Sequence, residues 1–351
     1  MNGRVSAAGL TREAIAAVDA QDMLGDVLAQ PQQIGDALWR TEAAGLPRRY
    51  MPGGLVVCGM GGSAIGGDLA RAAIGSRAER PMRVVRGYDL VPWMANDALV
   101  LCSSYSGNTE ETLACFEAAG QLGAPRVALT TGGKLAERAR DAGVPVIGVP
   151  AGMQPRAAVV YMTIASLQCA TAAGVCGSLE DEAAATAELL GRLAGEWGPD
   201  APPESEAKAL ANALSGTVPV VYGAGSTSGP AQRWKTQINE NAKQPAFAGV
   251  LPEANHNDIC AWDRADEFAR FSALLLYDDK LPPQLRRRLD LTAAVTGDHT
   301  HSVASRGETA LERVLSLVFL GDLVSVYLAV LAGVDPTPVD VLERFKQALA
   351  S

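Results

Sequence analysis

Short apolar segments alternate with amphipathic ones over much of the chain, beginning at residue 54. The segments GLVVCGM, MRVVRGY, ALVLCS, PRVALTT and VPVIGVP are apolar and are bounded by glycine, proline or polar residues, which is typical of buried strands. Between them lie the helical patterns GGDLARAAIG, LACFEAAGQLG and KLAERARDAG. Strands and helices that alternate in this way predict an α/β fold, a parallel sheet covered by helices on both faces.

The pattern of the first half recurs in the second half. VPVVYGAGSTSGPAQRWK is similar to LVVCGMGGSAIGGDLARA in its order of strand, glycine turn, hydroxyl residue and helix. This repetition predicts a duplicated α/β domain. We expect a helical N-terminal segment at 1–50, a first domain at 51–195, a linker rich in proline and acidic residues at 196–207, and a second domain at 208–351 that includes the C-terminal helices.

One segment, residues 314–334, is apolar on all faces and almost long enough to span a bilayer. Asp322 lies at its middle, where an ionised carboxylate is costly in lipid, and GVDP follows as a helix stop. We therefore expect a buried helix, packed in part against a second copy of the chain, and no membrane span.

Composition excludes several classes of protein. The 351 residues are 48% hydrophobic and carry a net charge of −9, and no basic run is longer than the RRR at 286–288, so we expect no nucleic-acid partner. The N-terminus lacks the continuous apolar stretch of a signal peptide. The six cysteines show no paired spacing, as expected of reduced core thiols in a cytoplasmic protein.

The stretch SSYSGNTEET, residues 103–112, places hydroxyls and a glycine between a predicted strand and a predicted helix. The first N–H groups of a helix have no partner within the helix, and its dipole is positive there, so such a turn favours an anion. Ser104, Ser106 and Thr109 can hold a phosphate with neutral donors. A simple helix cap is the alternative, but one hydroxyl would satisfy it.

The turn GMGGSA at 59–64 also matches the loose dinucleotide pattern G-x-G-x-x-G/A. An NAD site needs a carboxylate at the end of the second strand. Here that strand runs into Arg86 and Gly87, and Asp89 is the first carboxylate, so the pattern disfavours a dinucleotide. The nucleotide-binding pattern G-x-x-x-x-G-K-[ST] is missing from the sequence.

Polar residues gather in the segment 234–262. Glu240 lies between two asparagines at the end of a predicted helix, where the negative end of the helix dipole favours the protonated carboxyl and suits a general base. A solvated ion pair of Glu240 with Lys243 explains the same residues equally well. His256 lies in the polar loop NHND, a setting typical of catalytic histidines. The HTH at 299–301 has no acidic or cysteine partner at metal-ligand spacing, so we expect no metal site there.

Six motifs together resemble a known family. GMGGSAIGGD, SYSGNTEET, PRAAVVY, NENAK, NHND and GVDPTPVDVLERFK occur in that order between residues 59 and 346. They resemble the motifs of the bifunctional phosphoglucose/phosphomannose isomerases, which consist of two sugar-isomerase (SIS) domains. The resemblance implies two flavodoxin-like three-layer sandwiches, a hexose 6-phosphate substrate, no cofactor and no metal, and a homodimer with shared active sites.

The resemblance also implies a role for particular residues. Arg156 would stabilise an enediolate, Glu240 would move the proton between C1 and C2, and His256, from the partner subunit, would serve ring opening with Lys346. Thr337 is a candidate for the position that governs tolerance of both epimers. The phosphate would be bound by Gly62, Ser63, Ser104, Ser106 and Thr109.

Two other functions compete with the isomerase. A SIS-type sugar-phosphate regulator would bind without catalysis, and the presence of Glu240 and His256 argues against it. An NAD(P)-binding protein is the third possibility, and a cofactor titration would detect it.

Overall fold

The computed structural model describes residues 9–46 and 48–350. The described chain divides into two compact units. Unit A consists of residues 29–191 and 306–316, and unit B of residues 9–28, 192–305 and 317–350. The four-part division expected from the sequence stays a prediction. Each unit contains one parallel sheet, as the alternating pattern predicted.

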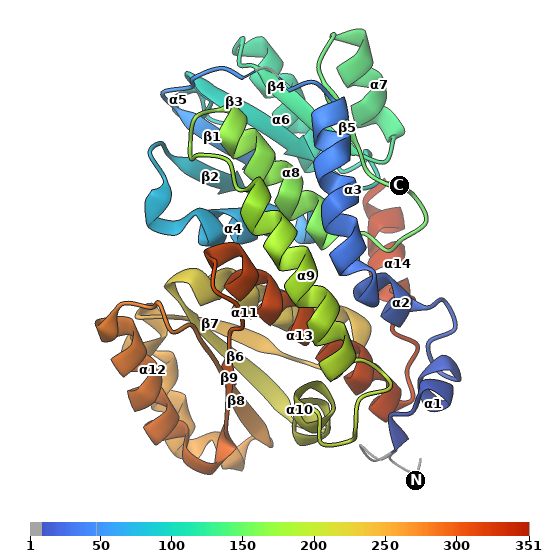
Figure 1. The fold of residues 1–351 in the computed structure, drawn as a ribbon, viewed down its shortest axis with the longest axis vertical. Helices are drawn as coiled ribbons and strands as arrows, with labels where there is room; N and C mark the ends of the chain where they lie inside the picture. Colours follow the sequence, from blue (N-terminus) through green and yellow to red (C-terminus); the bar gives the residue numbers. More distant parts are fainter. Residues whose placement is uncertain (1–8, 47, 351) are drawn as a thin grey trace. The chain divides into compact units, whose positions relative to one another are not determined.

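The sheet of unit A has the strand order β2-β1-β3-β4-β5, with every neighbouring pair parallel (Figure 1). This is the flavodoxin-like order. Cys58 at the end of β1 lies beside Cys102 near the end of β3, so the loops that follow these two strands leave the sheet at the same edge. The strands are β1 (Gly54–Cys58), β2 (Met82–Val85), β3 (Ala98–Ser103), β4 (Arg126–Thr130) and β5 (Val146–Gly148).

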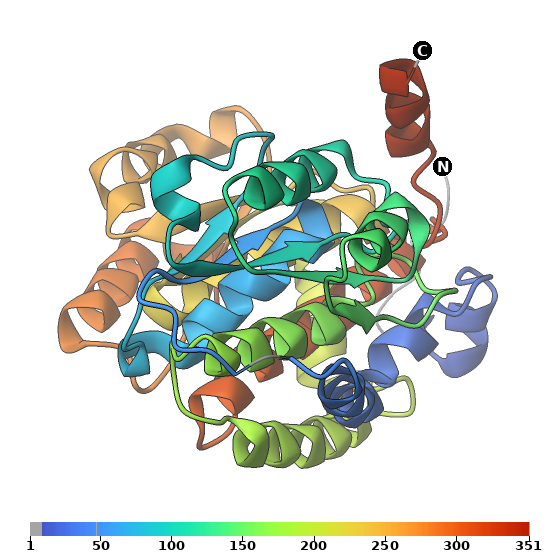
Figure 2. The same ribbon diagram turned by 90° about the horizontal axis from the view of Figure 1, so that it is seen from above.

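Helices cover both faces of this sheet (Figures 1 and 2). On one face, Val56, Val100 and Ala128 pack against residues of α5 (Pro92–Ala95), α6 (Glu110–Gln121) and α7 (Gly133–Asp141). On the other face lie α4 (Gly61–Ile74) and α8 (Val159–Ala172), with α3 (Gln30–Ala43) against α8. Because both faces are buried, β1 and β3 are apolar at consecutive positions.

Unit B repeats the arrangement with a sheet of order β7-β6-β8-β9, again parallel throughout. Helix α12 (Pro283–Thr296) packs on one face through Leu289, while Ala231 of α11 (Ser228–Asn241) lies against Gly223 on the other face. The three-layer α/β fold predicted for both domains is confirmed. The strands are β6 (Val218–Ala224), β7 (Phe247–Leu251), β8 (Phe271–Tyr277) and β9 (Thr300–Ala304).

The remaining helices lie, in sequence, before the first strand, between the strands of the two sheets, or after the last strand. They are α1 (Arg12–Ala16), α2 (Met23–Leu28), α9 (Glu180–Trp197), α10 (Glu206–Leu214), α13 (Ala310–Ala332) and α14 (Asp340–Ala350).

Helix α13 contains the apolar segment predicted at 314–334. By length and composition it could cross a membrane, but its most apolar window is entirely buried within the protein, as in a core helix. Asp322 forms a buried two-pronged ion pair with Arg233 of α11, with distances of 3.0 Å from Nε to Oδ1 and 2.9 Å from Nη2 to Oδ2. The buried helix is confirmed. The suggestion that a partner chain covers it was wrong, because this chain already buries all of its sides.

The six cysteines all lie within the described residues, and none of them is in a disulfide. Five are buried and Cys260 is exposed. Hydrogen bonding to Cys102 and burial raise the pKa of the Cys58 thiol well above its ordinary value, and burial raises that of Cys169 to about 12. The five buried cysteines are free core thiols, as predicted, whereas the prediction was wrong for Cys260, which is exposed.

Candidate functional site

The loop between β3 and α6 brings its hydroxyls together at the carboxyl edge of the unit A sheet. Ser104 Oγ lies 2.8 Å from Thr109 Oγ1 and accepts a hydrogen bond from the Gly107 N–H at 3.1 Å. The Ser106 hydroxyl is exposed and accepts from the Asn108 N–H at 3.2 Å. Gly107 has φ +69°, and a Cβ there would collide with the carbonyl oxygen of Gly132, so only glycine fits this turn.

The hydroxyls of this loop do not cap the helix that follows. Thr109 is the N-cap residue of α6, but within the described chain its side chain makes no capping hydrogen bond. The capping alternative therefore does not explain the loop. The N-terminus of α6, whose dipole end is positive, and the adjacent Ser104 and Thr109 hydroxyls therefore remain a candidate anion site.

The turn between β1 and α4 adjoins this loop. Ser63 Oγ accepts a hydrogen bond from the Tyr105 N–H at 3.2 Å, and the Ser63 carbonyl accepts one from the Ser103 hydroxyl, also at 3.2 Å. A Cβ on Gly62 would lie 3.1 Å from the Pro155 carbonyl oxygen and 3.3 Å from Arg156 Cα. The close approach that Gly62 allows thus places the Arg156 backbone against the same turn.

Arg156 is held in place before α8 begins. It is 3% exposed, and its Nη1 donates to the Gln154 side-chain oxygen at 3.2 Å. Arg156 thus brings a buried cation to the turn at the N-terminus of α4. Unit A therefore brings together all six of the residues predicted for its part of the site: Gly62, Ser63, Ser104, Ser106, Thr109 and Arg156.

Tyr105 is a positioning residue that the sequence analysis passed over. Its hydroxyl donates to the Pro150 carbonyl and accepts from the Met153 N–H, each at 3.0 Å. Its backbone carbonyl accepts from the Thr131 hydroxyl at 2.8 Å. These bonds fix the middle of the hydroxyl loop from both sides. The sequence did contain a sign of this role, because Tyr105 is a single large aromatic residue among the small residues of SSYSGNT.

The corresponding turn of unit B has a different role. The Ser226 hydroxyl donates to the Asp278 carboxylate at 2.8 Å, and the Thr227 hydroxyl donates to the Leu276 carbonyl at 3.0 Å. Asp278 is buried at the end of β8. Because a carboxylate already occupies this turn, the second copy of the strand–glycine–hydroxyl pattern is unsuited to a phosphate.

Glu240 is half-buried at the penultimate position of α11. The two asparagines beside it have structural partners: Asn239 Nδ2 donates to the Gln244 carbonyl at 2.9 Å, and Asn241 Nδ2 donates to the Ser325 hydroxyl at 2.8 Å. The polar residues that looked out of place in a helix therefore fix the end of α11. They hold the backbone of Glu240 on both sides.

His256 and Lys346 are both exposed in this chain. His256 ends the short helical turn Glu253–His256, which follows the carboxyl end of β7, whereas Glu240 precedes the amino end of that strand. A five-residue strand is on the order of 16 Å long, so Glu240 and His256 lie near opposite edges of one sheet. Unit B therefore does not bring these two residues of one chain together. Lys346 lies on α14, whose residues 340–349 are exposed.

The HTH segment belongs partly to strand β9. His301 is on β9, and His299 Nε2 lies 3.4 Å from Asp266 Oδ2. Within residues 9–46 and 48–350, no group of three or more histidine, cysteine, aspartate or glutamate side chains is placed to hold a metal ion.

Comparison with known proteins identifies the family. The chain is 39% identical over 304 residues to the bifunctional phosphoglucose/phosphomannose isomerase of Caldicellulosiruptor bescii, covering 84% of this chain and 89% of that protein. It is 40% identical over 301 residues to the protein of the same name from Aquifex aeolicus, covering 84% and 90%. The chain belongs to this family. The resemblance stated from the six motifs is confirmed.

Two further comparisons concern the C-terminal domain and the fold. A family model for the C-terminal SIS domain of bacterial phosphoglucose isomerase matches residues 203–349. A solved structure of a hypothetical protein from Thermus thermophilus has the same fold, with a TM-score of 0.73 at 16% identity, covering 96% of this chain and 93% of that one.

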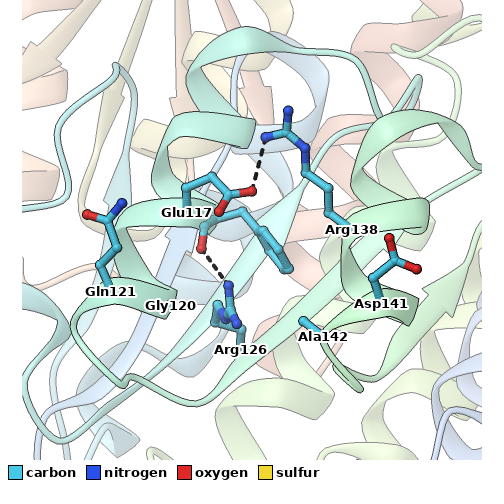
Figure 3. Close-up of a pocket in the computed structure, with 8 residues that line it drawn as sticks. Glu117, Gly120, Gln121, Arg126, Arg138, Asp141 and Ala142 are labelled. Atoms are coloured by element: carbon cyan, nitrogen blue, oxygen red, sulfur yellow. Dashed lines mark hydrogen bonds and ion pairs between the residues drawn. The ribbon is translucent and has the colours of Figure 1, made fainter.

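A groove of about 480 Å³ in unit A is unrelated to these loops (Figure 3). It is lined by the C-terminal parts of α6 and α7 and by Arg126, the first residue of β4, so it opens at the amino edge of the sheet. Arg138 in its lining pairs with Glu117 at 3.1 Å, and Arg126 donates to the Phe116 carbonyl at 2.9 Å. We assign the groove no part in the chemistry of this family member.

Proposed function

We propose that this protein is a cytoplasmic, metal-independent aldose–ketose isomerase that interconverts fructose 6-phosphate with glucose 6-phosphate and mannose 6-phosphate through a cis-enediolate. The two curated relatives described above are named for phosphoglucose and phosphomannose isomerase activity. The single observation that carries the proposal is the hydroxyl loop. Ser104 Oγ and Thr109 Oγ1 lie 2.8 Å apart beside the N-terminus of α6, and Thr109 does not cap it, which supports binding of an anion at this turn.

The chemistry assigned to each residue follows from the reaction. Moving a proton between adjacent carbons requires one carboxylate base, which we assign to Glu240. The charge that develops on the C1 and C2 oxygens requires a fixed cation, and the buried guanidinium of Arg156 meets that need. We assign ring opening to His256 and Lys346, and phosphate binding to Gly62, Ser63, Ser104, Ser106 and Thr109. Thr337 stays a candidate for contact with the epimeric carbon.

A coupled assay with each aldose phosphate tests the proposal. Purified protein should convert both glucose 6-phosphate and mannose 6-phosphate to fructose 6-phosphate, and a chelator should leave both rates unchanged. The competing function, a non-catalytic SIS-type regulator, predicts saturable binding of the same sugars with no turnover. Binding without turnover would therefore replace the isomerase with the regulator.

We further propose that the active form is a homodimer in which His256 is supplied by the partner subunit. The separation of Glu240 and His256 along β7 supports this, because one chain cannot place both side chains on one sugar. Helix α14 supports it too: Val341, Phe345 and Leu349 follow helical spacing on one face and are 73%, 61% and 64% exposed. An exposed apolar face of this kind marks an interaction surface.

Mixing two inactive variants tests the shared site. Glu240→Gln protein and His256→Ala protein, carrying tags of different size, are exchanged in mild denaturant, and the mixed dimer is isolated. It contains one site with both intact residues, so activity should reappear at up to half of the wild-type level per dimer. A mixed dimer no more active than its parents would place both residues in one chain.

A further inference from the structure

Lys243 occupies a backbone conformation that usually belongs to glycine. It follows the C-cap residue of α11, Ala242, and has φ +53°. Helices commonly end with glycine at this position, because a side chain in the left-handed region is strained. A lysine kept there in spite of the strain indicates that its side chain has a specific task.

The Lys243 ammonium joins two segments that are far apart in the sequence. Nζ donates to the Asn241 carbonyl at 3.2 Å, to the Asp335 carbonyl at 2.9 Å and to the Pro336 carbonyl at 3.0 Å. The first acceptor is the last residue of α11, next to Glu240. The other two belong to the turn 335–337, in which the Thr337 N–H donates to Asp335 Oδ1 at 2.9 Å.

The end of α11 is a rigid support for this contact. Arg233 is paired with Asp322, the indole of Trp234 donates to the Leu317 carbonyl at 2.7 Å, and Asn241 is bonded to Ser325, so α11 is fixed along α13. The turn 335–337 directly precedes α14, the helix that carries Lys346. We call the Lys243 hydrogen bonds to the Asn241, Asp335 and Pro336 carbonyls the clamp. Because the clamp joins the end of α11 to the turn 335–337, it fixes where this turn and the start of α14 lie relative to Glu240.

We propose that Lys243 is a positioning residue: its ammonium holds the turn 335–337 against the end of α11 and thereby sets the geometry between Glu240 and the segment that leads to Lys346. This inference rests on the proposed isomerase function. The phosphate-binding loops belong to unit A, and the clamp lies within unit B. Losing the clamp should therefore reduce turnover and leave the affinity for the sugar phosphate unchanged.

Three substitutions at this position separate positioning from stability. Lys243→Met removes the donor and keeps the strain, whereas Lys243→Gly removes the donor and relieves the strain. Both should lower kcat by about 10- to 100-fold, the effect of a small misplacement of reacting groups, with KM for fructose 6-phosphate unchanged. The glycine variant should keep or exceed the wild-type Tm. Lys243→Arg, which can still donate to carbonyls, should recover most of kcat.

Two other lysines of unit B are matched controls. Lys280 is exposed and pairs with Asp279, and Lys208 donates to the Pro199 and Ala201 carbonyls at 2.8 and 2.7 Å, a clamp on a segment without predicted site residues. Lys280→Met should change nothing, and Lys208→Met should lower Tm without lowering kcat. If Lys243→Gly keeps the wild-type kcat, or if Lys243→Met loses kcat only in proportion to folded protein, the proposal is overturned.

Hydrogen exchange at the Thr337 amide tests the clamp without an activity assay. Exchange of this N–H should accelerate at least tenfold in Lys243→Met and Lys243→Gly and stay at the wild-type rate in Lys280→Met. Wild-type protein that shows this protection but no isomerase activity would refute the proposed function and leave the clamp standing. Unchanged exchange in both Lys243 variants would refute the clamp itself.

Discussion

Replacing Ser106 and Thr109 together by alanine should weaken sugar-phosphate binding strongly without unfolding the loop. Each hydroxyl is expected to donate one hydrogen bond to a charged phosphate, and such bonds contribute about 1.5–3 kcal/mol each. Two of them amount to about 3–6 kcal/mol, and because 1.4 kcal/mol corresponds to a tenfold change, the dissociation constant should rise by about 10²- to 10⁴-fold.

The structure indicates that the loop itself survives this change. Ser106 is exposed, and the Thr109 side chain does not cap α6, so the usual stability cost of losing an N-cap hydroxyl does not apply. Ser104 Oγ still accepts from the Gly107 N–H, and Tyr105 still anchors the middle of the loop. The Tm should therefore stay close to that of the wild type.

Calorimetric titration with fructose 6-phosphate measures the effect, and Ser226→Ala is the matched control. Ser226 stands in the equivalent turn of unit B and donates to Asp278, so its loss should leave the dissociation constant unchanged. An unaltered affinity in the Ser106→Ala, Thr109→Ala protein would remove the hydroxyl loop from the site. A large fall in Tm would show that these hydroxyls are structural.

Three further predictions concern the core and the surface. Arg233→Met takes the guanidinium away from the buried Asp322 carboxylate and should lower the free energy of unfolding in urea by about 3–5 kcal/mol. Adding Asp322→Leu to this variant should restore most of that loss. Equal stability of the single and double variants would contradict the reasoning. Native protein should react with a thiol reagent at one cysteine, Cys260, and at the other five only in denaturant; a second fast thiol would contradict the burial. Burial lowers the pKa of His301 in the folded protein, so below about pH 6.5 the unfolded state binds more protons than the folded state. The stability contributed by neutral His301 is therefore complete above about pH 6.5 and is lost as the pH falls through the lowered folded pKa. His301→Asn should flatten the dependence of Tm on pH between 7 and 5, and an unchanged slope would refute this.

Local patterns were sufficient to predict the strands of the unit A sheet and the first strand, β6, of the unit B sheet. The run ALVLCS became β3 at Ala98–Ser103, because a strand buried on both faces is apolar at every position. Helix boundaries were less accurate where glycine lies inside a helix. Helix α4 begins at Gly61, ahead of the predicted segment GGDLARAAIG, since its first turn contains glycines that favour helices poorly. Helix α10 (Glu206–Leu214) was not predicted, and its first two residues fall in the segment 196–207 that was expected to be linker because of its prolines and acidic residues.

Contacts between distant residues could not be read from the sequence. Asp322 was recognised as out of place in an apolar helix, but its partner, Arg233, lies 89 positions away and carries no local signal. For Lys243 the sequence offered only a local ion pair with Glu240 as one of two alternatives, and it gave no sign that the ammonium also binds a carbonyl 93 positions away. Such contacts depend on how α11 and α13 pack, which periodicity alone does not determine.

The central claim is that Glu240 moves a proton between C1 and C2 of the sugar phosphate. The most direct test is incorporation of solvent deuterium at C2 of glucose 6-phosphate, followed by NMR with wild-type and Glu240→Gln protein. The wild type should incorporate deuterium, because a carboxylate base exchanges its proton with water during some turnovers. The glutamine variant should bind fructose 6-phosphate normally while incorporation falls by roughly 10²- to 10⁴-fold. Incorporation at the wild-type rate in the Glu240→Gln protein would contradict the claim.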